Sequence, residues 1–278
     1  MADPLAIASL VIYAILLQPT LYCFWAHGRR GFLGWFYLQI FCLLRIIGNA
    51  VELHEAATPT PTSSHVLLIN NIGLSPLLLA TAGILHEARR ARNSRLRNKI
   101  EWFLVLQYHL LVSAALGLII VGVVFLENGN LSSNKRALLK IGAALVVLCW
   151  VLLLVWTLVS MPSYQTDTSA AIYRDGSKLL LGVVVALPLV AVRLVYGVSS
   201  LILELNESSS EFTTSLAIKV CLSVIPEMLL TAGFVVVGIN TRNIWVPFGR
   251  WTRVEQSGSV DGPSYLELLS SREQGTTS

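Results

Sequence analysis

Seven apolar runs of about 20 residues each constrain the fold of this chain more than any other feature. They cover residues of about 5–25, 32–53, 65–86, 102–126, 137–160, 178–203 and 214–238. A helix needs roughly 20 mostly apolar residues to cross the hydrocarbon core of a bilayer. A soluble helical bundle is excluded, because so many nearly uncharged segments would aggregate in water. The pattern predicts an all-α polytopic membrane protein, a seven-transmembrane helix bundle.

The composition agrees with this prediction and excludes other classes of protein. Hydrophobic residues make up 54% of the 278 residues and charged residues only 13%, whereas about a quarter of the residues in a soluble domain are charged. A disordered chain needs low hydrophobicity. The 4 cysteines all lie within apolar runs and do not indicate a disulfide scaffold. The first run has no basic segment or small-residue cleavage site, so we expect a retained span rather than a signal peptide.

Basic residues between the runs predict the orientation of the helices. Lys and Arg concentrate in the cytoplasmic loops of membrane proteins. With the amino terminus outside, fourteen Lys and Arg residues fall on the cytoplasmic side and two on the other side. The fourteen include Arg29 and Arg30, in an expected first loop, and six residues of a basic stretch at 89–99. The distribution predicts an N-out, C-in protein of the endoplasmic reticulum or plasma membrane.

Two glycosylation sequons favour the same orientation. Asn130 and Asn206 each begin an Asn-x-Ser motif, and both lie in loops expected to face away from the cytoplasm, where glycosylation takes place. We therefore predict that both are glycosylated. Residues 1–253 are expected to form the seven-helix domain. Residues 254–278 are rich in Ser, Gly, Thr and acidic residues, and we expect a disordered cytoplasmic tail.

Ionisable and polar residues within the apolar runs indicate a functional site, because such groups are costly in lipid and usually face the bundle interior. Spacings of three, four and seven residues place them on common helix faces. The stripes are Arg45, Asn49 and Glu52; Asn70, Asn71 and Ser75; Arg193, Tyr196 and Ser200; and Lys219, Ser223, Glu227 and Thr231. Since lipid would not tolerate these stripes, we expect them to face one another around a polar pocket that opens outward.

Two stretches of the sequence carry a family resemblance. One is His27-Gly-Arg-Arg-Gly-Phe-Leu-Gly-Trp35, followed by Phe41-Cys-Leu-Leu-Arg45-Ile-Ile-Gly48. The other is Asn70-Asn-Ile-Gly-Leu-Ser-Pro-Leu-Leu-Leu-Ala80-Thr-Ala-Gly83. Over about residues 5–245, the chain resembles a functionally uncharacterised family of fungal integral membrane proteins with seven spans. The resemblance implies a fungal origin and one seven-helix domain, and it provides no catalytic residues. The layout is also similar to that of fungal membrane-bound terpene cyclases.

Terpene cyclases of this kind protonate their substrates with embedded carboxylic acids, which makes Glu227 and Glu52 the candidate catalytic residues by position alone. The residues expected to contact a small apolar or amphiphilic ligand are Arg45, Asn49, Asn70, Asn71, Arg193, Tyr196 and Lys219. If an arginine pairs with Glu227, that carboxylate stays ionised and Glu52 becomes the candidate acid. A terpene-cyclase-like or isomerase-like enzyme of fungal secondary metabolism is one hypothesis. A receptor or sensor, and a lipid or metabolite transporter, are the alternatives.

A second polar group lies toward the cytoplasmic side. His86, Glu87 and Glu101 are expected at helix ends, in loop ion pairs with the neighbouring arginines. We expect the basic stretch at 89–99 to set the topology, and contact with a cytoplasmic partner is the alternative. The histidines and cysteines show no metal-ligand spacing, so no metal or cofactor is expected. Apart from its basic charge, nothing in the sequence indicates nucleic-acid binding.

Overall fold

The computed structural model describes residues 4–57, 73–93, 98–127, 133–162, 171–205 and 215–245. These residues are almost entirely helical and contain no strands. Residues 1–244 form one compact unit, and the chain from residue 245 onward forms another. The predicted boundary at residue 253 and the predicted tail lie outside the described residues.

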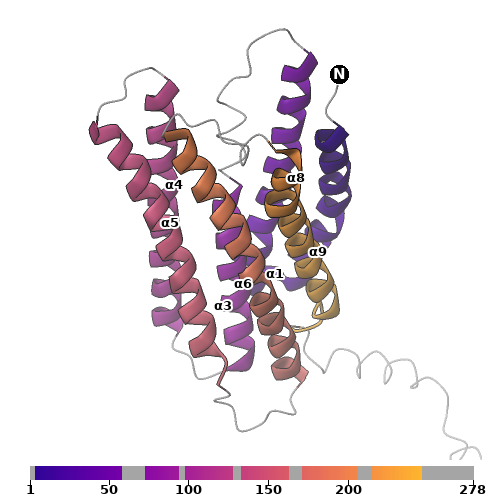
Figure 1. Cartoon of the computed structure of the whole chain (residues 1–278). Coiled ribbons are helices and arrows are strands. Elements are labelled where there is room, and N and C mark those ends of the chain that lie inside the picture. The colour runs from indigo at the N-terminus through magenta and orange to yellow at the C-terminus, as the bar shows by residue number, and fades with distance from the viewer. Residues whose placement is uncertain are drawn as a thin grey trace, which may run out of the picture. The chain divides into compact units, whose positions relative to one another are not determined.

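The first unit is built from helices connected in chain order, most of them long (Figure 1). They are α1 (Pro4–Ala57), α3 (Leu74–Arg92), α4 (Asn98–Glu127), α5 (Ser133–Ser160), α6 (Ala171–Leu205), α8 (Leu216–Lys219), the π-helical turn η1 (Val220–Val224) and α9 (Ile225–Asn240). Among the described residues, 5 continuous helical segments are long and apolar enough to cross a membrane. The chain is therefore an all-helical, multi-pass membrane protein.

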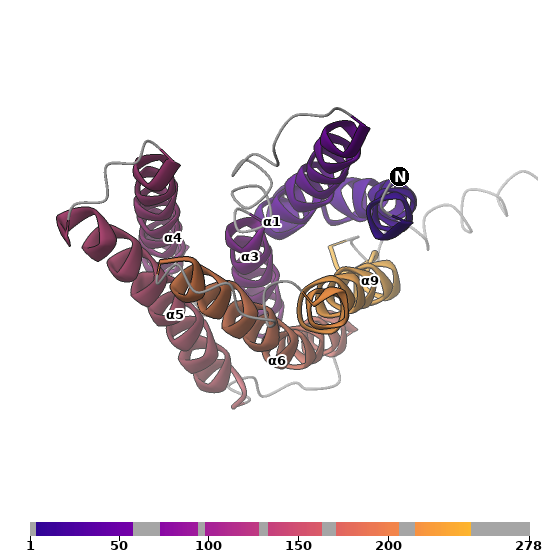
Figure 2. The ribbon, with the colours of Figure 1, turned by 45° about the horizontal axis from the view of Figure 1, so that its top comes forward.

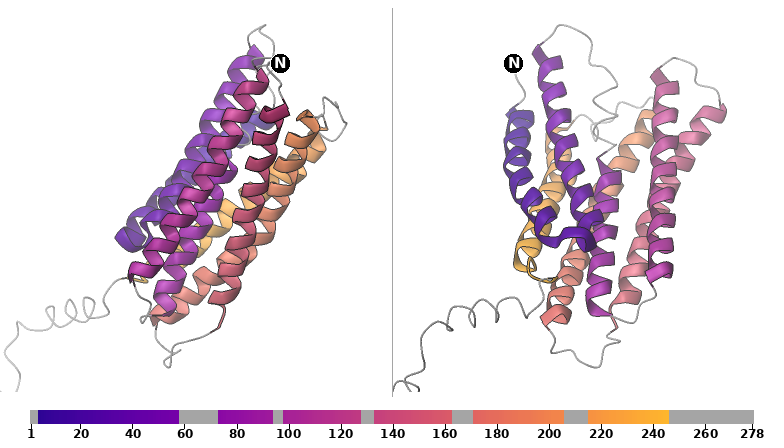
Figure 3. Two further views of the ribbon diagram at one scale, coloured as in Figure 1. Left: turned by 90° about the vertical axis from the view of Figure 1, so that its left-hand side faces the viewer. Right: turned by 180° about the vertical axis from the view of Figure 1, so that it is seen from behind.

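α1 consists of two arms that fold back on each other at Gly28 (Figure 3). Gly28 has a φ of 56°, in a left-handed region that residues with a Cβ rarely adopt. The arms run antiparallel, since the Thr20 hydroxyl donates to Gln39 Oε1 at 2.7 Å and the Tyr13 and Phe41 rings meet edge to face at 5.7 Å. The chain thus reverses direction at Gly28, between the first two predicted spans, and the connection is a break between two helical arms rather than an extended loop.

α3 is the most enclosed helix of the unit and packs against both α1 and α6 (Figure 2). Every residue from Leu74 to Ala88 is buried. Its backbone approaches that of α1 so closely that a Cβ on Gly83 would lie 2.4 Å from the Gly34 amide nitrogen. Small residues commonly allow such contacts between membrane helices. The predicted span began at residue 65, but 65–72 lie outside the described residues.

α4 and α5 pack against each other, both contact α3, and α5 also contacts α6. Toward one end of this pair, Val123, Leu139 and Ala143 form an apolar cluster with Leu201 of α6. Other large apolar side chains of α4, such as Phe103 and Leu110, are exposed. Exposed apolar faces on long helices are the surfaces that a bilayer covers, and they agree with the bilayer environment expected from the sequence.

The last long helix changes its geometry near its start. α8 continues into η1, which continues into α9. Pro226 follows the π turn and has no amide hydrogen, so it cannot donate to the carbonyl group four residues earlier. π turns of this kind are rare and often occur at functional sites. The π turn therefore indicates a candidate functional site in this part of the bundle.

Candidate functional site

Three charged residues from three helices meet in the interior of the bundle. Glu227 Oε1 accepts hydrogen bonds from Arg45 Nη2 and from Arg193 Nε. The exposed fractions are 2% for Glu227, 8% for Arg45 and 1% for Arg193. Arg45 comes from the second arm of α1, Arg193 from α6 and Glu227 from α9. The structure thus brings together the three innermost charges that the sequence predicted to share a site, here called the Glu227 cluster.

Aromatic rings and a second ion pair surround the Glu227 cluster. The Arg45 guanidinium lies 5.6 Å from the Phe41 ring centre, and the Arg193 guanidinium lies 5.8 Å from that of Tyr196. Cations are attracted to ring faces at such distances. On the same face of α1, the partly exposed Glu52 carboxylate accepts a hydrogen bond from Lys219 Nζ at 2.9 Å.

These ion pairs bear on the two carboxylates that the sequence suggested as catalytic acids. Glu227 accepts hydrogen bonds from two guanidinium groups, and Glu52 accepts one from an ammonium group. A cation within hydrogen-bond distance favours the charged form of a carboxyl group. The geometry therefore favours a binding or packing role for both carboxylates over proton donation.

A polar recess of about 20 Å³ lies between the arms of α1 and the start of the last long helix. It is lined by Leu5, Ala6, Ser9, Tyr13, Arg45, Asn49, Glu52, Lys219, Ser223, Val224 and Glu227. This volume holds about one water molecule. The predicted pocket is therefore a small polar recess, with no room as it stands for a terpene-sized substrate.

Two donors at the recess lack hydrogen-bond partners among the described residues. They are the Tyr13 hydroxyl and the Asn49 side-chain nitrogen. Tyr13 is only 1% exposed. A buried polar group without a partner costs about 1–3 kcal/mol, so such groups usually mark a bound water or a ligand.

Some of the remaining residues predicted for the site are described by the structure, and others are not. Ser200 and Thr231 donate to carbonyl oxygens of their own helices. Tyr196 contacts Arg193 through its ring, and Ser75 lies elsewhere, in an apolar cavity of about 40 Å³ between α3, α4, α5 and α6. The others are the candidate ligand contacts Asn70 and Asn71 and the sequons Asn130 and Asn206. These four asparagines lie outside the described residues.

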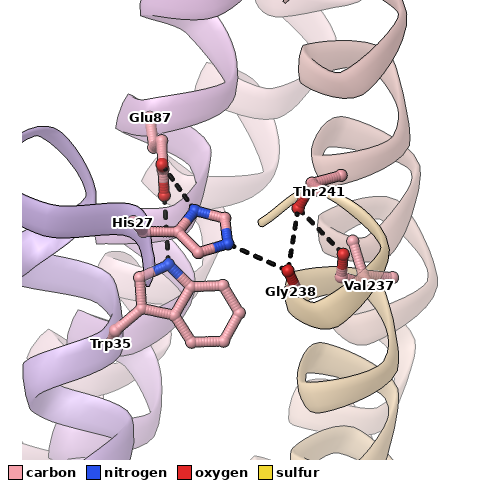
Figure 4. A network of polar contacts seen from close by, with 6 residues as sticks. All are labelled: His27, Trp35, Glu87, Val237, Gly238 and Thr241. Carbon is pink, nitrogen blue, oxygen red and sulfur yellow. Dashed lines mark hydrogen bonds and ion pairs between the residues drawn. The ribbon is translucent and has the colours of Figure 1, made fainter. Parts of the chain in front are cut away.

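A second buried network, which the sequence analysis missed, includes His27, Trp35 and Glu87 (Figure 4) and lies close to the reversal of α1 at Gly28. His27 Nδ1 lies 2.7 Å from Glu87 Oε1, and His27 Nε2 lies 3.0 Å from the Gly238 carbonyl oxygen. Trp35 Nε1 donates to Glu87 Oε2 at 3.1 Å. The side chains of His27 and Glu87 are 0% exposed. We call these residues the His27 network; it joins both arms of α1 to α3 and α9.

The contacts fix the hydrogen count of the His27 network. A backbone carbonyl can only accept, so His27 Nε2 carries a hydrogen toward Gly238. One further proton then lies between His27 Nδ1 and Glu87 Oε1. Whichever atom holds it, the pair is neutral overall. The prediction of a loop ion pair for Glu87 is wrong, because Glu87 is a fully buried residue of α3 that binds His27 and Trp35.

The neighbouring charges on α3 do form ion pairs with the basic stretch. Arg89 donates to Glu101 Oε1 at 2.8 Å, and His86 lies 3.6 Å from the other oxygen of that carboxylate. Arg92 donates to the carbonyl oxygen of Ser160 at 2.6 Å. The first arginines of the stretch therefore attach α3 to α4 and α5, which leaves less of the stretch for a cytoplasmic partner.

Comparison with known proteins places the chain in a family. A family model described as a domain of unknown function, DUF7702, matches residues 1–244. The chain belongs to the DUF7702 family. No curated protein matches it. A crystal structure of Exiguobacterium sibiricum rhodopsin is similar, with a TM-score of 0.48 and 8% identity, over 85% of this chain and 96% of that chain. The fungal origin and the similarity to terpene cyclases remain predictions.

Proposed function

We propose that this DUF7702 protein is a membrane receptor or sensor that binds the polar head of a small amphiphilic molecule in the recess beside the Glu227 cluster. One observation carries the proposal. The Tyr13 hydroxyl and the Asn49 amide are donors at the recess without hydrogen-bond partners among the described residues. A ligand with an oxygen acceptor would supply those partners.

The charge at the recess favours an anionic head group. Arg45, Arg193 and Lys219 contribute three positive charges, and Glu52 and Glu227 contribute two negative ones. Both carboxylates are already engaged by these cations. A carboxylate head at the mouth of the recess, with one oxygen in the place of a water molecule, would offset the remaining positive charge and accept from Tyr13. Charged hydrogen bonds of this kind are about twice as strong as neutral ones.

The last long helix could transmit occupancy of the recess to the other end of the bundle. Lys219, the last residue of α8, and Ser223 of η1 line the recess, and Glu227 of α9 follows one turn later. Further along α9, the carbonyl oxygen of Gly238 accepts from His27. One residue corresponds to a rotation of about 100° in an α-helix, so conversion of the π turn would rotate Lys219 relative to Glu227. A ligand that fills the recess would favour one of the two states.

The enzyme hypothesis is the alternative, with Glu52 or Glu227 as the acid. The ion pairs of both carboxylates and the small volume of the recess count against it. A transporter would need a polar path through the bundle. The two polar regions described here, at the recess and at the His27 network, are separate sites, which favours a receptor or sensor.

The same proposal includes seven crossings with the amino terminus outside. α1 counts as one of the five candidate spans, so its second arm and the buried α3 bring the number of crossings to seven. This orientation puts the recess on the non-cytoplasmic side and the His27 network on the cytoplasmic side. We also propose that the protein lies in the plasma membrane or endoplasmic reticulum, where a ligand on the non-cytoplasmic side would reach the recess.

A matched pair of tyrosine variants tests the proposal. Fatty acids of several chain lengths would be added to the purified protein, and binding would be measured by thermal shift and by titration. We expect at least one to bind, and Tyr13→Phe to weaken it by about tenfold through loss of one hydrogen bond. The free Tyr13→Phe protein should be at least as stable as wild type, because the hydroxyl has no partner to lose and its burial is unfavourable.

Tyr108→Phe is the control for this experiment. The Tyr108 hydroxyl is also buried, but it donates to the Cys149 carbonyl oxygen at 3.3 Å, away from the recess. Its loss should cost about 1 kcal/mol of stability and leave fatty-acid binding unchanged. Equal binding by wild type and Tyr13→Phe, or binding by neither, would contradict the proposal.

A further inference from the structure

An open apolar groove of about 290 Å³ runs between α6 and α9, away from the recess. Its α6 side includes Gly182 and Ala186, and its α9 side includes Gly233. These small residues leave the floor open, since a Cβ on Gly233 would meet no atom within 4 Å. Leu181 and Leu229 form part of the two rims, and more than half of the surface of each residue is exposed.

The two helices border the groove in antiparallel register. Lys178 and Asn240 line one end, and Leu189 and Leu229 line the other. Between these ends, a Cβ on Gly182 would lie 3.2 Å from the Val237 side chain, a contact that agrees with this register. Each side spans twelve residues, and their eleven steps correspond to about 16 Å of helix. That is about half of the 30 Å hydrocarbon core of a bilayer, so the groove has the length of one leaflet.

Basic residues surround the polar end of the groove. Lys178 lies at that end, Arg174 precedes it by one turn, and Arg242 follows two residues after Asn240. Arg174 and Arg242 are exposed. Among the described residues at this end, Asp175 carries a negative charge, and its carboxylate accepts a hydrogen bond from Lys178 Nζ at 2.8 Å. The described charges at this end therefore sum to a positive value, as the phosphate of a lipid head group requires.

We propose that the groove is a binding site for one anionic glycerophospholipid. An acyl chain lies on Gly182, Ala186 and Gly233, and the phosphate lies beside Lys178. The chain then ends near Leu189, about one turn before Arg193 of the Glu227 cluster. The site does not depend on the ligand proposed for the recess, because the two share no lining residue.

Glycine variants test the acyl-chain part of the proposal. The full-length protein in mild detergent would be mixed with phosphatidylserine or phosphatidylcholine, and bound lipid would be counted by native mass spectrometry. Gly233→Leu fills the groove and should lower retention of both lipids by about tenfold. Gly117→Leu on α4 is the matched control, because a Cβ there also meets no atom within 4 Å. Equal retention by both variants would overturn the proposal.

Lys178→Gln tests the head-group part. Wild type should retain phosphatidylserine about fivefold better than phosphatidylcholine, from about 1 kcal/mol per basic residue at a lipid surface. Lys178→Gln should reduce this preference and leave phosphatidylcholine retention unchanged. Equal retention of the two lipids by wild type would overturn the anionic assignment.

A cross-linking measurement on the wild-type protein covers the case in which Gly233→Leu does not fold. Phosphatidylserine with a photoreactive group in its acyl chain should label Leu181, Val185 and Leu229 above the level found on Phe103 and Leu110, which are exposed on α4. Labelling of both sets at the same level would show ordinary bilayer contact and would overturn the proposal.

Discussion

At the scale of residues, Glu227 balances two buried cations. The guanidinium groups of Arg45 and Arg193 both donate to one of its oxygens. We expect Glu227→Gln to lower the free energy of unfolding by about 3–5 kcal/mol, because it leaves buried charges uncompensated. Denaturant or thermal unfolding of the purified protein in detergent would measure the change.

Lys219→Gln is the control for this prediction. It removes the partly exposed pair with Glu52, in which the Lys219 side chain is 29% exposed. Solvent screening limits such pairs to about 1 kcal/mol or less. Comparable losses in the two variants would mean that burial does not distinguish the two pairs.

Trp35 tests the His27 network. Trp35→Phe removes the hydrogen bond to the buried Glu87 carboxylate, and we expect it to cost about 1.5–3 kcal/mol of stability. Trp25→Phe is the matched control, since Trp25 is 75% exposed, and should change stability by about 0.5 kcal/mol or less. Combining Trp35→Phe with Glu87→Gln should cost less than the sum of the single changes. Strict additivity would argue against the network.

The residues differ in how far the sequence could predict them. Arg45, Arg193 and Glu227 lie well inside apolar runs, and the cost of charge in lipid requires that they meet. His27 and Glu87 lie just beyond the ends of their apolar runs. A charged residue costs little free energy there, so its presence does not indicate that it must find a partner in the bundle. The segment from His27 to Trp35 contains both residues that α1 contributes to the network. Helical spacing could not predict that they meet, because the helix is broken at Gly28 between them.

At the scale of elements, the contact between α1 and α3 depends on two small residues. A Cβ on Gly83 would lie 2.4 Å from the Gly34 nitrogen. Gly83→Ala must separate the helices, and we expect a loss of about 1–3 kcal/mol from this overpacking. Gly117→Ala, with open space at its Cβ, should be neutral or stabilise the helix by up to about 1 kcal/mol. Unfolding curves that rank the two variants in the opposite order would refute this contact.

The apolar runs predicted where the long helices lie, because run length follows from the thickness of the bilayer. They placed a reversal between residues 25 and 32, but they could not predict its confinement to Gly28 or the π turn at Val220–Val224. Both depend on single backbone positions that hydrophobicity does not report. α3 extends past the predicted end to Arg92, because its charged turns bind α4 and α5 instead of solvent.

At the scale of the whole molecule, the orientation can be tested through Asn130 and Asn206. If both loops face the lumen during synthesis, wild type made with microsomes carries two glycans. Asn130→Gln and Asn206→Gln should each remove one mobility shift on a gel, and the double variant should remove both. An unshifted wild type, or a shift that survives in the double variant, would contradict an outside amino terminus.

The sequence predicted a helical membrane protein with a polar interior, but it could not predict how much space that interior leaves. Charged stripes on facing helices can surround a chamber or close it through ion pairs. Here Glu227 and Glu52 bind the cations across from them, and the recess between them is small. Only the side-chain geometry distinguishes the two outcomes.

The fold-back of α1 also bears on biogenesis. Its stabilising contacts join residues close in the chain, such as Thr20 with Gln39 and Tyr13 with Phe41. The hairpin can therefore close while the ribosome is still translating α3, and in the proposed orientation Arg29 and Arg30 would hold its tip in the cytosol. The rest of the bundle would then assemble on a template that left the translocon already folded.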